Sequence, residues 1–106
     1  MLDTTPLTAA TDRFADRLRG APQSRLQRGA AAAALELARE LSVRAQRLEE
    51  AGGQPRIMPD AGVFAVADQL TVAAADLVEA WRTAPSEAEL DEAVRLVGRT
   101  VAAAGL

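Results

Sequence analysis

The stretch Ala61–Trp81, AGVFAVADQLTVAAADLVEAW, determines the fold of this chain. Wound as a helix centred on Leu70, it carries apolar side chains over an arc wider than a surface helix needs. The polar cover on the opposite side consists of Asp68, Gln69, Asp76 and Glu79. A helix this apolar has to be packed by two or more neighbours, while its charged residues would be costly inside a bilayer. The stretch therefore predicts the buried central helix of a bundle and not a membrane span.

Start and stop signals predict three further helices. Pro6 is typical of a first helical turn, and Gly20 with Pro22 ends that helix. The capping pattern of Ser24 with Gln27 opens a second helix. A second capping pattern, Ser86 to Glu89, follows Pro85 and opens the last helix, which stops at Gly105. The expected helical regions are 6–20, 24–51, 61–81 and 86–105.

These regions predict an all-α chain in which residues 1–106 form a single helical-bundle domain. Short connections and the lack of alternating strand patterns favour an antiparallel, up-down-up-down four-helix bundle. Its third helix is the buried one. Its second helix, if unbroken to Ala51, is close to 40 Å long at about 1.5 Å per residue, so part of it should protrude from a monomer.

The composition argues against an enzyme or a metalloprotein. The chain has no cysteine, histidine or tyrosine, so thiolate ligands, Glu-x-x-His iron sites and the commonest general base are all missing. We expect no cofactor and no metal. The net charge of −3 argues against nucleic acid and anionic membranes as partners. No signal peptide precedes the first helix, so the expected location is cytoplasmic.

All twelve basic residues are arginines, and five of them gather around the first interhelical turn. They are Arg13, Arg17, Arg19, Arg25 and Arg28. Such a cluster can attract nucleic acid, but no aromatic residue is interleaved with it for base stacking. We expect these arginines to pair within the bundle or with a partner protein.

Several apolar residues point away from the stripes that their own helices bury. Leu35 and Val43 lie eight residues apart on the second helix, with Arg39 and Gln46 between them. This arrangement resembles the apolar core and polar rim of an interface. It predicts a homodimer joined along this face, with a twofold axis between the copies. Val72, on the central helix, also points outward.

A second interpretation places a ligand at one end of the bundle. Arg44 lies in the inner stripe of the second helix, where it either reaches water along its alkyl stem or contacts an anion. The loop from Gly52 to Asp60 holds Ile57 and Met58, which either plug the open end or belong to a binding loop. The possible ligand contacts are Arg44, Met58, Phe64 and Trp81.

The sequence therefore supports two hypotheses of different classes. The first is a non-enzymatic helical interaction module that self-associates, binds a regulatory protein partner, or both. The alternative is a ligand-binding regulatory bundle with an apolar pocket and an arginine anion contact. A filled bundle end favours the first hypothesis, and a large pocket with Arg44 turned inward favours the second.

Overall fold

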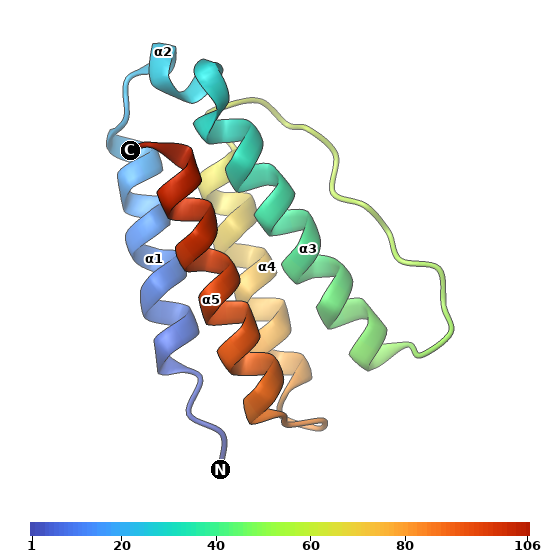
Figure 1. Cartoon of the computed structure of the whole chain (residues 1–106). Helices are drawn as coiled ribbons and strands as arrows, with labels where there is room; N and C mark the ends of the chain where they lie inside the picture. Colours follow the sequence, from blue (N-terminus) through green and yellow to red (C-terminus); the bar gives the residue numbers. More distant parts are fainter.

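Four main helices and two short helical segments make up the chain in a computed structural model that describes residues 1–106 (Figure 1). The elements are α1 (Thr5–Gly20), α2 (Gln23–Arg25), the kinked turn η1 (Leu26–Ala30), α3 (Ala31–Glu49), α4 (Val66–Ala80) and α5 (Glu87–Ala104). No strand is present. The all-α class and the four-helix bundle predicted from the sequence are confirmed.

The helix directions differ from the expected up-down-up-down order. α3 and α4 run in the same direction: Leu35 and Val66, from the early parts of both helices, line one hollow, while Arg44 and Leu77, from the later parts, line another. Figure 1 shows the connecting segment Glu50–Ala65 returning along α3 before α4 begins. α1 and α5 are likewise parallel to each other. The topology is therefore up-down-down-up.

The helix neighbours follow from this topology. α4 packs most extensively on α3 and also on α1, while α5 packs on both α1 and α3. α1 and α3 thus occupy opposite corners of the bundle, as do α4 and α5. One hydrophobic cluster of 24 buried residues joins the four helices.

α4 supplies the central packing surface that the sequence predicts. Its buried residues repeat at the spacing of a helical face and are Val66, Ala67, Leu70, Ala73, Ala74, Leu77 and Ala80. Trp81, directly after the helix, is buried as well. The helix begins five residues later than the expected Ala61, because Gly62 has a positive φ of 95° and the backbone there turns before it winds.

The expected long second helix is broken at Gly29. This residue has φ 143° and ψ −16°, a conformation that favours glycine, and it separates α3 from the short helical segment before it. That segment folds over the end of the bundle, where Arg25 Nη1 donates to the carbonyl oxygen of Gly105 at 3.1 Å. α3 is therefore about 28 Å long at about 1.5 Å per residue, and the predicted protrusion is not found.

The predicted cap of the last helix is present. The Ser86 hydroxyl accepts a hydrogen bond from the main-chain N–H of Glu89 at 3.2 Å, and the helix ends at Gly105 in a left-handed conformation. None of the helices combines the length and the hydropathy that crossing a membrane requires.

Candidate functional site

The outer face of α3, defined by Leu35, Arg39, Val43 and Gln46, is bound by the chain's own connecting segment. Arg39 Nε donates to the carbonyl oxygen of Met58 at 2.8 Å. Gln46 Nε2 donates to the carbonyl oxygen of Arg56, and Gln46 Oε1 accepts from the N–H of the same residue, both at 2.8 Å. A single glutamine thus satisfies both backbone groups of Arg56, which fixes the segment along the helix.

The two apolar residues of this face are not exposed. Leu35 retains 8% and Val43 retains 9% of its accessible surface within the single chain. The expectation that they form an outward patch is wrong, because residues 50–65 run back along α3 and the start of α4 packs beside Leu35. The pattern of an apolar core with polar neighbours did indicate a packing surface. In the fold, that surface is used within the chain.

Arg44 and Trp81 do come together, at the end of the bundle where α3 and α4 finish. Arg44 Nε donates to Glu40 Oε1 at 2.9 Å, and Arg44 Nη2 donates to Glu92 Oε1 at 3.2 Å. Trp81 Nε1 donates to Glu89 Oε2 at 3.3 Å. Two carboxylates therefore pair with this arginine and a third, Glu89, lines the same hollow, so the geometry does not support its use as an anion contact.

The other two expected ligand contacts lie elsewhere. Phe64 precedes α4 and is 74% exposed, a whole helix away from Trp81. Met58 packs on the hydrophobic core from the connecting segment, beside α3. The four residues of the expected ligand site therefore do not form one pocket. Phe64 and Trp81 flank α4 at its two ends, so the length of the helix separates them whichever way it runs, and the parallel direction places Trp81 beside Arg44.

The arginine cluster is largely satisfied within the chain. Arg17 Nη2 donates to the main-chain oxygen of Leu106 at 2.8 Å, as Arg25 does to Gly105. Arg19 Nη2 donates to Asp68 Oδ1 at 2.8 Å, and this hydrogen bond raises the pKa of Arg19 above its ordinary value. For these three residues, the expected pairing inside the bundle is confirmed.

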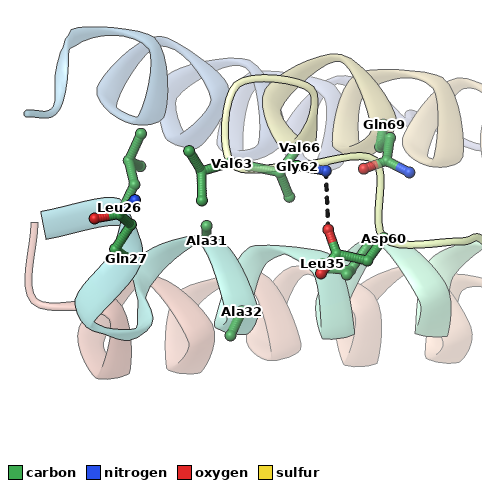
Figure 2. A pocket seen from close by; sticks show the side chains of 10 residues that line it. All are labelled: Leu26, Gln27, Ala31, Ala32, Leu35, Asp60, Gly62, Val63, Val66 and Gln69. Carbon is green, nitrogen blue, oxygen red and sulfur yellow. Dashed lines mark hydrogen bonds between the residues drawn. The ribbon is translucent and has the colours of Figure 1, made fainter. Parts of the chain in front are cut away.

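A second hollow lies where α3 and α4 begin, and Figure 2 shows it from close by. Its volume is about 230 Å³. The residues that line this α3–α4 pocket are Leu26, Gln27, Ala31, Ala32, Leu35, Asp60, Gly62, Val63, Val66 and Gln69. In Figure 2 the Ala31 methyl group points across the gap toward Val63, so the centre of the pocket is apolar.

One polar atom of the α3–α4 pocket has no partner. Gln69 Nε2 donates to the carbonyl oxygen of Pro59 at 2.9 Å, but Gln69 Oε1 is buried and accepts no hydrogen bond. Figure 2 shows this oxygen on the side of Gly62 and the nitrogen turned away. Nearby, Asp60 Oδ1 accepts from the N–H of Gly62 at 2.9 Å and holds the turn before α4. No pattern in the sequence indicates this site, because its residues come together only in the folded chain.

Large apolar side chains remain exposed beside α4. Phe64 lies just before the helix, and Val72, 54% exposed, lies on its outward side as expected. Ile57, 62% exposed, belongs to the connecting segment and lines a shallow hollow with Asp76 of α4. We refer to Ile57, Phe64 and Val72 as the α4 surface.

Comparisons of the chain with protein-family models, with curated protein sequences and with solved structures give no match.

Proposed function

We propose that this chain is a non-enzymatic interaction module that acts by self-association through the α4 surface. The observation that supports the proposal is the exposure of Ile57, Phe64 and Val72 after the chain has covered every other large apolar residue except Met1. Exposed aromatic and aliphatic side chains are typical of interface cores.

Covering this surface would remove apolar area from water. Burial of apolar area contributes roughly 25 cal/mol per Å², and one aromatic side chain can bury about 150 to 250 Å². Phe64 is therefore the strongest single candidate for an interface anchor. In a twofold dimer the same surface meets its copy, so each apolar residue contributes twice.

The charges beside the α4 surface are compatible with a second copy as the partner. Asp68 pairs with Arg19 at 2.8 Å, and Glu79 pairs with Arg82 at 3.2 Å. These intrachain pairs reduce the repulsion that two acidic helices would otherwise exert on each other. Like charges without such pairs would disfavour a symmetric contact.

Sedimentation equilibrium over a range of protein concentrations tests the proposal. The wild-type chain should approach twice its mass, and Phe64→Glu with Val72→Glu should return it to the monomer with unchanged helicity, because the new charges would face each other across the interface. Ala102→Glu, an exposed alanine on α5, is the matched control and should stay dimeric. A wild-type chain that stays monomeric at every concentration would contradict self-association.

Dimerisation that survives the α4 substitutions would place the interface outside the α4 surface. A cytoplasmic location stays a prediction from the sequence.

A further inference from the structure

The α3–α4 pocket combines an apolar interior with acceptor oxygens at one end. Leu26, Ala31 and Val63 supply part of the apolar lining, from η1, α3 and the turn before α4. Gln69 and Asp60 supply the oxygens. No lysine or arginine lines the pocket. A ligand therefore meets an apolar wall and, at one end, the Asp60 carboxylate and the Gln69 amide oxygen.

Gln69 Oε1 is the atom that most directly indicates a ligand. A buried acceptor without a hydrogen bond costs free energy, and such atoms are few in native folds. The amide nitrogen of Gln69 is held by Pro59, so rotation of the amide would exchange one unsatisfied group for another. No side chain or backbone group of the chain donates to this oxygen, so a donor from outside the chain can bind it.

The size of the pocket limits that donor to a small molecule. Its volume of about 230 Å³ is below that of the sites that hold drug-sized ligands, which begin near 300 Å³. It exceeds the engineered cavity of about 150 Å³ that binds benzene. The space therefore fits an apolar group of about five or six carbons with one polar head group.

We propose that the α3–α4 pocket binds a small primary amine in its ammonium form, with a short branched or aromatic tail. The ammonium group donates to Gln69 Oε1 and to the Asp60 carboxylate, and its charge is opposite to that of Asp60. The tail occupies the space between Ala31 and Val63. The proposed site lies at the start of α4 and does not depend on self-association.

Isotope-edited NMR of the full chain tests the proposal with three probes of equal shape. 3-Methylbutylamine should shift the amide signals of Ala31, Gly62 and Val63 in a saturable way. 3-Methylbutan-1-ol, which lacks the charge, should bind roughly fivefold more weakly, and 3-methylbutanoate should not bind. Equal binding of the amine and the alcohol would overturn the ammonium assignment, and the absence of saturable shifts with the amine would overturn the site.

Substitutions separate a specific contact from a general charge effect. Asp60→Asn keeps the acceptor that holds Gly62 but removes the charge, so it should weaken amine binding by roughly fivefold. Asp91→Asn on the far helix α5 makes the same change in net charge and should leave binding unchanged. Equal losses from both variants would show a non-specific attraction and overturn the role of Asp60.

Filling the pocket gives an independent check. Ala31→Leu places a larger side chain in the central space and should abolish amine binding while circular dichroism and thermal melting show a folded chain. Amine binding that survives in this folded variant would place the ligand elsewhere. If the variant does not fold, Ala31→Val makes the same comparison with a smaller increase in volume and should weaken binding.

Discussion

The two ends of the α3–α4 interface are formed by the same pair of parallel helices, but they differ in how their polar groups are satisfied. Where the helices finish, Arg44 and the Trp81 indole donate to three glutamates. Where they begin, the pocket retains space and Gln69 Oε1 has no partner.

The difference follows from how the side chains are anchored. At the end where the helices finish, arginine and glutamate meet from neighbouring helices and keep partial contact with water. Gln69 is as long as a glutamate, but its amide nitrogen is bound to the carbonyl oxygen of Pro59, which holds its oxygen in the hollow. A ligand is therefore better accommodated at the end with the unsatisfied oxygen than at the end where the charges are paired. The sequence analysis placed the possible ligand contacts around Arg44 and Trp81, because the position of Gln69 Oε1 depends on contacts that no local pattern indicates.

Truncation of a core leucine should have the largest effect on the free energy of unfolding, and the size of the effect should differ between the two ends of the α3–α4 interface. Leu77→Ala lies at the closed end, where Arg44 and Trp81 meet the glutamates. It is expected to lower the free energy of unfolding by about 2 to 5 kcal/mol, because the loss of a fully buried leucine leaves a cavity. Leu35→Ala, beside the existing pocket, should cost less, about 1 to 2 kcal/mol, since water can enter the enlarged space. Urea unfolding measures both. Equal losses would contradict the contrast between a closed and an open end.

Release of the connecting segment that joins the two ends should have the next largest effect. Gln46→Leu removes both hydrogen bonds to Arg56 and is expected to cost about 1 to 2 kcal/mol. Hydrogen exchange at the Arg56 amide should accelerate in this variant, while exchange in α5 should not change. An unchanged exchange rate at Arg56 would show that the segment is held by other contacts.

Removal of the charge at the closed end should have a smaller effect. Arg44→Met is expected to cost about 1 kcal/mol or less in thermal or urea unfolding, because both glutamate partners are substantially exposed and water screens the pairs. Raising the salt concentration should narrow the difference between variant and wild type. A loss of several kcal/mol would mean that the pairs behave as buried ones.

The smallest effect is expected at the open end. Gln69→Leu loses the hydrogen bond to Pro59 but also removes the unsatisfied oxygen, so the two changes should nearly cancel, to within about 0.5 kcal/mol. Gln69→Ala, which also loses the hydrogen bond but adds empty space, is the matched comparison and should be less stable. A large loss of unfolding free energy in the leucine variant would contradict the expectation that the unsatisfied oxygen destabilises the ligand-free chain.

The sequence predicted some contacts of the candidate site and missed others. The Glu40–Arg44 pair follows from i,i+4 spacing on one helix. The contact of Arg44 with Glu92 joins helices that are far apart in the chain, so no local pattern indicates it. The unsatisfied Gln69 oxygen likewise depends on where Pro59 and α3 lie, which is decided by the path of the connecting segment.

What the sequence alone determined is the local structure. The end of α1 at Gly20, the end of α3 shortly before Gly52, the start of α5 after Pro85 and the buried face of α4 follow from glycine and proline chemistry and from the 3.6-residue period. Glycine and proline chemistry and the helical period both act over a few neighbouring residues of the chain.

Only the tertiary structure decided the direction of α4, the break at Gly29 and the burial of Leu35 and Val43. Residues 50–65 are long enough either to turn back at once or to return along α3, since about nine extended residues span its length at roughly 3.3 Å each. Both paths bury an apolar face of α4, so the amphipathic pattern cannot distinguish them. The difference lies in long-range contacts such as those of Arg39 and Gln46 with the segment, which exist only once the chain has folded.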